Sequence, residues 1–176
     1  IVTTEFNIEG NPKEKFLALV LALKPTQVTL VPDAIDAITS NAGWDTLKHR
    51  DYLTDIIAEC KRNDIRTSIF VDPTLKMVEG AATTGTDRIE LYTEAFAEQY
   101  ALGNTKAIEP YTACAVLANT LKLGINAGHD LSLANIKFFK DHMPGLLEVS
   151  IGHALVSEAL YDGLESVVKK YLERLA

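Results

Sequence analysis

The chain has 176 residues and a net charge of −7, and 47% of its residues are hydrophobic and 23% charged. These values are typical of one globular domain, and the acidic balance, without a Lys/Arg-dense run, argues against nucleic-acid binding. The longest apolar run, residues 16–23, is too short to cross a bilayer, and no signal peptide is visible, so a cytoplasmic location is expected. Cys60 and Cys114 lie at apolar positions of expected helices and are expected to be buried free thiols.

The first half of the chain alternates short apolar strands with helices. Strands are expected at residues 4–9, 27–31 and 67–71, and helices at 11–23, at 47–62 and from 72 to an end near 80–85. Asn11 before Pro12, and Asp72 before Pro73, have the cap-then-proline order of a helix start. Residues 33–46 form an expected long polar loop, either a lid that closes over a substrate or an ordinary surface loop.

The second half continues the same alternation. Strands are expected at residues 88–92, 123–126 and 147–150, and helices at 108–121, 131–143 and 154–175, with a loop between the strand at 88–92 and the helix at 108. The last helix is expected to bury one stripe, formed by Leu155, Leu160, Leu164, Val168 and Leu172. Six βα units in strict alternation predict a parallel sheet covered by helices.

Two architectures contain such a sheet, the doubly wound fold and the (β/α)8 barrel. The first strand is followed by Glu9-Gly10-Asn11-Pro12, which is not a glycine-rich phosphate turn. Polar residues end most of the strands, which favours a TIM barrel whose loops feed one central site. Because the chain starts within a strand, we expect a single domain over residues 1–176 that supplies strands 3–8 of the barrel, with the N-terminal units absent from the sequence.

Two Gly-His turns follow successive strands, Gly128-His129 and Gly152-His153, and they suggest one site built from neighbouring loops. His129 can exchange a proton near neutral pH. Gly152 and His153 precede the last helix, where backbone N–H groups and the helix dipole favour a phosphate. Each of these residues could instead be structural, as a helix cap or a tight turn.

Two carboxylates, Glu9 and Glu90, lie on strands that would line the centre of a barrel. Glu9 could have a raised pKa and act as a general base, or be a surface glutamate, whereas Glu90 could merely orient its neighbours. A glycosidase pair is disfavoured, because aromatic residues are only 7% of the chain. A metal site at His129, Asp130 and His153 is disfavoured as well, because no HxH or HExxH spacing is present.

Seven segments, in order along the whole chain, together resemble the pyridoxine 5′-phosphate synthase family of vitamin B6 biosynthesis. They are Phe6-Asn7-Ile8-Glu9, Leu30-Val31-Pro32, residues 38–45 (ITSNAGWD), residues 68–72 (SIFVD), Ile89-Glu90-Leu91, Asn126-Ala127-Gly128-His129 and Ile151-Gly152-His153-Ala154. The resemblance implies a transferase-type (β/α)8 enzyme without metal or organic cofactor. It would condense 1-deoxy-D-xylulose 5-phosphate with 3-amino-2-oxopropyl phosphate, and release pyridoxine 5′-phosphate, phosphate and water.

The resemblance also implies roles for particular residues. Glu9 would be a catalytic proton acceptor and His129 a catalytic proton donor. The substrate-binding residues would be Thr39 in the loop, Asp130 after the histidine, and Gly152 with His153 at the phosphate. The implied partners are small phosphorylated substrates, inorganic phosphate and further copies in a homo-oligomer, with neither nucleic acid nor membrane.

The sequence departs from the family at its start. The family's Asn-x-Asp-His turn and His-x-Arg-Glu-Asp-Arg-Arg segment are not in this sequence, so the chain is expected to be incomplete and inactive alone. Asp130 stands where relatives often have glycine. Two alternatives stay open: another phosphate-binding barrel isomerase or lyase, and a non-catalytic assembly module. An aldolase would need a Schiff-base lysine, and no expected strand ends in lysine.

Overall fold

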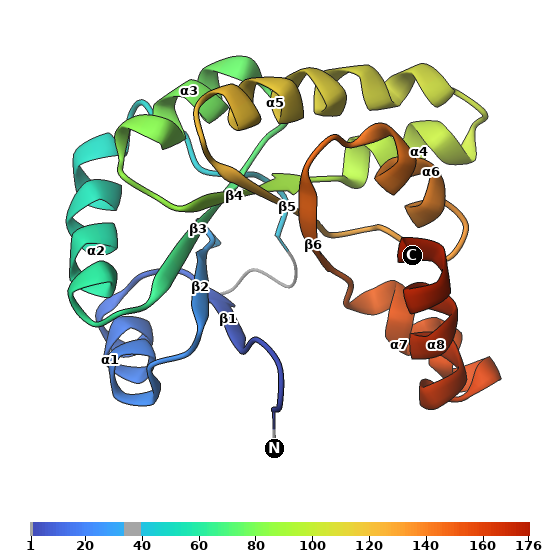
Figure 1. Cartoon of the computed structure of the whole chain (residues 1–176), viewed down its shortest axis with the longest axis horizontal. Coiled ribbons are helices and arrows are strands. Elements are labelled where there is room, and N and C mark those ends of the chain that lie inside the picture. Colours follow the sequence, from blue (N-terminus) through green and yellow to red (C-terminus); the bar gives the residue numbers. More distant parts are fainter. Residues whose placement is uncertain (1, 34–39) are drawn as a thin grey trace.

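Six strands and nine helical segments follow one another in the computed structural model, which describes residues 2–33 and 40–176 (Figure 1). The strands are β1 (Asn7–Gly10), β2 (Gln27–Leu30), β3 (Arg66–Val71), β4 (Arg88–Tyr92), β5 (Gly124–Gly128) and β6 (Leu146–Ser150). The helices are α1 (Glu14–Leu23), α2 (Arg50–Arg62), α3 (Leu75–Thr83), α4 (Glu94–Ala101), the 3-10 turn η1 (Thr105–Ile108), α5 (Glu109–Thr120), α6 (Ile136–His142), α7 (His153–Asp162) and α8 (Leu164–Leu175).

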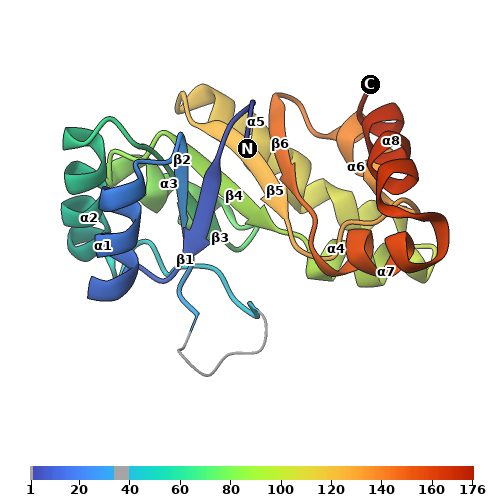
Figure 2. The ribbon, with the colours of Figure 1, turned by 90° about the horizontal axis from the view of Figure 1, so that it is seen from below.

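The strands form one parallel sheet in the order β1-β2-β3-β4-β5-β6, which confirms the predicted alternation. The sheet is curved into a half-barrel, and the helices surround its outer side from α1 round to α7 and α8 (Figures 1 and 2). β1 and β6 are its two edges. All strands point the same way, so the loops after them gather at one edge of the sheet, where a barrel enzyme has its site.

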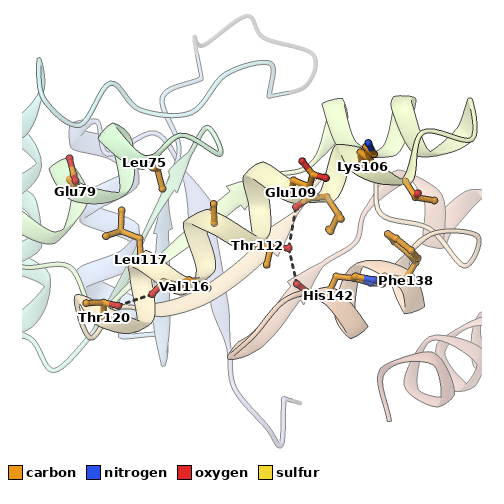
Figure 3. A pocket seen from close by; sticks show the side chains of 13 residues that line it. Leu75, Glu79, Lys106, Glu109, Thr112, Val116, Leu117, Thr120, Phe138 and His142 are labelled. Atoms are coloured by element: carbon orange, nitrogen blue, oxygen red, sulfur yellow. Dashed lines mark hydrogen bonds between the residues drawn. The ribbon is translucent and has the colours of Figure 1, made fainter.

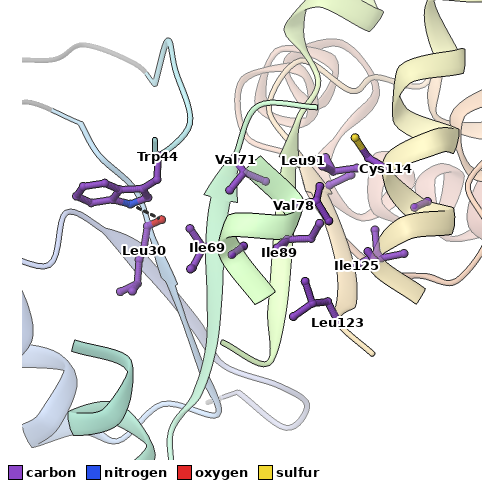
Figure 4. Close-up of a cluster of buried hydrophobic side chains, with 14 of the residues drawn as sticks. Leu30, Trp44, Ile69, Val71, Val78, Ile89, Leu91, Cys114, Leu123 and Ile125 are labelled. Atoms are coloured by element: carbon purple, nitrogen blue, oxygen red, sulfur yellow. Dashed lines mark hydrogen bonds between the residues drawn. The ribbon is translucent and has the colours of Figure 1, made fainter. Parts of the chain in front are cut away.

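The outer face of the sheet carries the hydrophobic core. Ile69, Ile89, Leu91 and Ile125 are fully buried there and pack against helix residues such as Val78 (Figure 4). Burial of this apolar surface stabilises the layer of helices on the sheet. Cys60 and Cys114 belong to the same core, and both thiols are free and buried as predicted.

The alternate side chains of the strands form a polar inner face, which we call the concave face. It comprises Asn7, Glu9, Gln27, Thr29, Arg66, Ser68, Arg88, Glu90, Asn126, Glu148 and Ser150. Arg88 donates to the carboxylate of Glu148 at 3.0 Å and to the Asn126 side-chain oxygen at 3.2 Å. Gln27 of β2 donates to Glu148 of β6 at 3.3 Å, so the curvature brings strands from opposite ends of the sheet into contact.

The two expected cap-then-proline helix starts are wrong in their detail. Asn11 donates its side-chain N–H to the Asp33 carbonyl at 2.7 Å, and the N-cap of α1 is Lys13, without a side-chain cap. Asp72 accepts the Gly43 N–H at 3.1 Å instead of capping α3. Both polar side chains therefore fix neighbouring loops, and each proline lies in the turn that precedes its helix.

Two segments differ from the predicted elements. The expected loop after β4 contains α4, which buries Phe96 in the core. The expected last helix is divided at Gly163, whose φ of +80° ends α7 before α8 begins. The predicted stripe is also wrong, because α8 buries Val167 and Tyr171 while Leu160 is 82% exposed. No helix among the described residues is long and apolar enough to cross a membrane.

Candidate active site

A cleft of about 410 Å³ opens at the carboxyl edge of the sheet. Of the described residues, twelve line it: Glu9, Val31, Asp33, Ser40, Phe70, Glu90, His129, Asp130, Ser150, Ile151, Gly152 and His153. The cleft therefore brings together five of the six predicted site residues, from three separate βα units. Thr39, the sixth, lies outside the described residues.

Glu9 lies near the end of β1 and accepts two hydrogen bonds. The Ser150 hydroxyl donates to Glu9 Oε1 at 3.0 Å across the sheet, and the Asn7 side-chain N–H donates to the same oxygen at 3.0 Å. Although Glu9 reaches solvent at the cleft, the surrounding protein removes hydration from its charge and raises its pKa. The bond from Ser150 opposes this rise and the charge of Glu148 adds to it. A carboxylate with a raised pKa is a better general base.

Glu90 is the main residue that the sequence did not assign to the site. Its side chain is only 1% exposed, and its Oε2 has no hydrogen-bond partner among the described residues. Burial raises the pKa of Glu90 well above its ordinary value, and the charge of nearby Glu9 raises it further. Gly128 makes room for this carboxyl, because a Cβ at position 128 would lie 2.1 Å from Glu90 Oε1.

His129 follows β5 in an unusual backbone conformation. Its φ is +71° and that of Asp130 is +54°, a left-handed region that costs a non-glycine residue about 1–2 kcal/mol. The His129 Nδ1 bonds to the Asp130 carboxylate, and the Tyr92 ring packs edge-on against the imidazole, with centroids 5.3 Å apart. The partly buried imidazole is held on two sides and faces the cleft, as a proton donor or acceptor requires.

Gly152 and His153 form the turn between β6 and α7. Both are exposed to the cleft, and α7 begins at His153 with Gly152 as its N-cap residue. The first N–H groups of a helix have no partner within the helix and attract anions. An added Cβ at Gly152 would meet nothing within 4 Å, so this side of the turn is open to a ligand.

The part of the long loop that the structure describes is anchored at Gly43 and Trp44. A Cβ at Gly43 would lie 2.4 Å from the Val71 Cα, so this glycine permits close packing on the end of β3. The Trp44 indole N–H donates to the Leu30 carbonyl at 3.1 Å (Figure 4). Ser40 donates to the Asp33 carboxylate at 2.6 Å, and both residues line the cleft.

A larger groove of about 940 Å³ lies on the outer layer of helices (Figure 3). Its floor is mostly apolar, with Val116 and Leu117 of α5 and Phe138 of α6, and Thr112 donates to the His142 carbonyl at 2.9 Å. The groove shares no lining residue with the cleft at the carboxyl edge of the sheet. No cluster of three or more His, Cys, Asp or Glu side chains that could hold a metal occurs among the residues described.

Comparison with known proteins identifies close relatives. The family model described as pyridoxal phosphate biosynthesis protein PdxJ matches residues 1–176. Pyridoxine 5′-phosphate synthase of Flavobacterium johnsoniae is 70% identical over 175 residues, which are 99% of this chain and 74% of the relative. The synthases of Christiangramia forsetii and Porphyromonas gingivalis are 65% and 51% identical, with the same coverage.

Solved structures share the fold at much lower identity. A structure described as native KDPGal has a TM-score of 0.57 at 11% identity, over 95% of this chain and 68% of the other. The Amycolatopsis orientalis BexX/CysO complex has a TM-score of 0.58 at 14% identity, over 94% of this chain and 64% of the other. These likenesses concern the fold alone, and they place the half-barrel among TIM-barrel-like proteins.

Proposed function

Because the chain belongs to the PdxJ family of pyridoxal phosphate biosynthesis proteins, we propose that its cleft forms pyridoxine 5′-phosphate by general acid–base catalysis. The protein is an enzyme of vitamin B6 biosynthesis, as are its relatives named pyridoxine 5′-phosphate synthase. The observation that carries the proposed chemistry is the convergence of Glu9, His129 and the Gly152-His153 turn on one cleft.

In this proposal 1-deoxy-D-xylulose 5-phosphate and 3-amino-2-oxopropyl phosphate condense in the cleft. Imine formation, enolisation and dehydration each require a proton transfer. Glu9, with its raised pKa, accepts a proton, and His129 donates one to a leaving oxygen. Burial and the charge of Glu9 favour the protonated form of Glu90, so the proposal assigns the role of proton acceptor to Glu9.

We propose that the backbone N–H groups of Gly152 and His153 hold a substrate phosphate, and that inorganic phosphate binds the same place. The helix dipole of α7 favours an anion at that position. Asp130 would contact substrate through its backbone while its side chain bonds to His129. Thr39 would contact the deoxyxylulose phosphate from the loop, and no metal or organic cofactor is required.

We further propose that the six strands are strands 3–8 of a (β/α)8 barrel, in a single domain over residues 1–176. Support comes from the curvature of the sheet, its two unpaired edges at β1 and β6, and relatives of which this chain covers 74%. We also propose a homo-oligomer in the cytoplasm. Large apolar side chains on α7 and α8, such as the 92% exposed Tyr161, offer surface for a second copy.

His129→Asn tests the proposed chemistry. In the enzyme with all eight βα units of the proposed barrel, product formation from the two phosphorylated substrates should fall by about 10²–10⁴-fold, because a general acid is removed. Substrate binding and the unfolding temperature should change little, since the imidazole is partly exposed. His142→Asn is the matched control: His142 ends α6 beside Phe138 and lines the outer groove, not the cleft, so its loss should leave turnover intact. Full activity of His129→Asn would refute the proton-donor role.

A further inference from the structure

The left-handed turn at His129 is held from the neighbouring strand by one buried hydroxyl. Thr93 directly follows β4, and its side chain is fully buried. Its hydroxyl donates to the Gly128 carbonyl at 2.9 Å and also reaches the His129 carbonyl. The Thr93 backbone N–H donates to the same Gly128 oxygen at 3.1 Å. Thr93 therefore contacts the carbonyl groups on both sides of the His129 Cα, whose backbone angles set the direction of the imidazole.

We propose that Thr93 is a positioning residue that keeps the His129 backbone left-handed and so directs the imidazole into the cleft. The proposal rests on the proton-donor role of His129 proposed above. Thr93 does not line the cleft, so it would not contact a substrate bound there. Its effect on turnover would therefore come from the position that it gives to His129.

Two backbone hydrogen bonds also restrain the turn. The His129 N–H donates to the Ser150 carbonyl at 3.3 Å, near the long limit of such a bond, and the Leu131 N–H closes the turn on the His129 carbonyl at 2.7 Å. A non-glycine residue stays left-handed only where its surroundings impose it. Without the Thr93 hydroxyl, we expect His129 to relax toward negative φ, which would rotate its imidazole away from the edge of Tyr92.

Thr93→Val removes the hydroxyl while keeping the shape of the side chain. Because a displacement of about 1 Å of a reacting group can cost about 10²-fold, we expect kcat to fall by about that factor. KM should stay within about twofold of the wild-type value, since the phosphate sites are untouched. Thr93→Ser, which restores the hydroxyl, should recover most of the lost kcat. A crystal structure of Thr93→Val should show His129 outside the left-handed region.

Thr86→Val is the matched control. Thr86 is also a buried threonine beside β4, and its hydroxyl contacts the carbonyls of Thr67 and Arg88 at 3.2 and 3.1 Å, at the amino end of the strand. It should lose comparable stability but keep its kcat. Wild-type kcat in Thr93→Val, an equal loss in both valine variants, or a lower kcat with the φ of His129 unchanged would each overturn the proposal.

Turnover tests the proposed function, whereas the backbone conformation of His129 tests the positioning role of Thr93. If the enzyme with all eight βα units of the proposed barrel formed no product, or if His129→Asn in that enzyme were fully active, the proposed chemistry would be refuted. The φ of His129 in the Thr93→Val crystal structure would still decide whether the hydroxyl holds the turn. A left-handed His129 in that structure would refute the positioning role whatever the activity.

Discussion

Gly128→Ala is the substitution that most directly tests how β5 makes room for the site. A Cβ at position 128 would lie 2.1 Å from Glu90 Oε1 and 2.9 Å from Ser150 Cβ. Ordinary contacts begin near 3.4 Å, so the Glu90 carboxyl would have to move by roughly 1.3 Å. Glu90 is 1% exposed, so the carboxyl would have to move within a packed interior.

Two separate losses are expected from this displacement. Overpacking a well-filled interior costs about 1–3 kcal/mol, so the free energy of unfolding should fall by about 2 kcal/mol in urea titrations. A movement of this size beside Glu9 should lower kcat by about 10²-fold in the product-formation assay. The two losses are distinguishable because the fraction of folded protein can be measured under the conditions of the kinetic assay.

Gly124→Ala provides the control at the other end of β5. Its Cβ would lie 2.7 Å from Arg88 Cγ and 3.0 Å from Leu147 Cδ1, which belong to side chains that can move. This variant should lose stability without a comparable loss of kcat. If Gly128→Ala kept wild-type turnover, or if both alanine variants lost activity only in proportion to their unfolded fraction, the reasoning about Glu90 would be wrong.

Three further changes probe the pKa of a buried carboxyl, the loop anchor and the last helix. A carboxyl whose pKa rises on folding stabilises the fold below about pH 4.3 and loses that contribution as the pH rises through its folded pKa. The unfolding free energy of Glu90→Gln should therefore decrease less than that of the wild type as the pH rises above about 4.3. Urea titrations over a range of pH measure this, and an identical pH dependence in the two proteins would contradict it. Gly43→Ala should lower the melting temperature strongly, because its Cβ would lie 2.4 Å from the Val71 Cα, and an unaltered melting temperature would contradict it. Val167→Ala should lower the free energy of unfolding by about 1–3 kcal/mol, because Val167 is buried. Val168→Ala should lower it little, because Val168 is 38% exposed. Equal losses in the two variants would contradict the burial of Val167 in place of Val168.

The strands were the most predictable part of the fold. The strand at residues 88–92 matches β4 residue for residue, and every other predicted strand overlaps an observed one. Strands of a parallel sheet are short, apolar on at least one face and bounded by polar turns, so local composition is enough to locate them. Helix starts were less predictable, because Asn11 and Asp72 bond to groups that are distant in sequence.

The break at Gly163 shows what periodicity alone leaves out. Apolar residues recur at helical spacing on both sides of the glycine, so a single helix with one stripe was a consistent interpretation. In the structure α8 turns at Gly163 and packs Val167 and Tyr171 against Ile136 of α6. Which stripe is buried depends on the direction of that turn, and the turn is set by tertiary contacts.

Some residues of the cleft could be predicted from a local sequence pattern alone. Glu90 was not assigned to the cleft, because that assignment depends on the direction of its side chain. A strand followed by a Gly-His turn located His129 and Gly152-His153 without any knowledge of packing. Glu90 required knowing which face of β4 it occupies. The alternation of charged Arg88 and Glu90 with apolar Ile89 and Leu91 carried that signal, because period-two alternation separates the two faces of a strand.

The two ends of the concave face explain why the perturbed carboxyls lie at the cleft. At the amino end Arg66 bonds to Glu5 and lowers the pKa of that carboxyl. Toward the carboxyl end Glu9 accepts bonds from neutral donors, and neither Glu9 nor Glu90 bonds to a lysine or arginine among the described residues. Burial is the largest cause of both raised pKa values, and the charge of Glu148 adds to the rise at Glu9 while the charges of Glu9 and Glu148 add to the rise at Glu90. The concave face therefore has paired charges at its amino end. At the cleft, where proton transfer is proposed, the carboxyls of Glu9 and Glu90 have no lysine or arginine partner among the described residues.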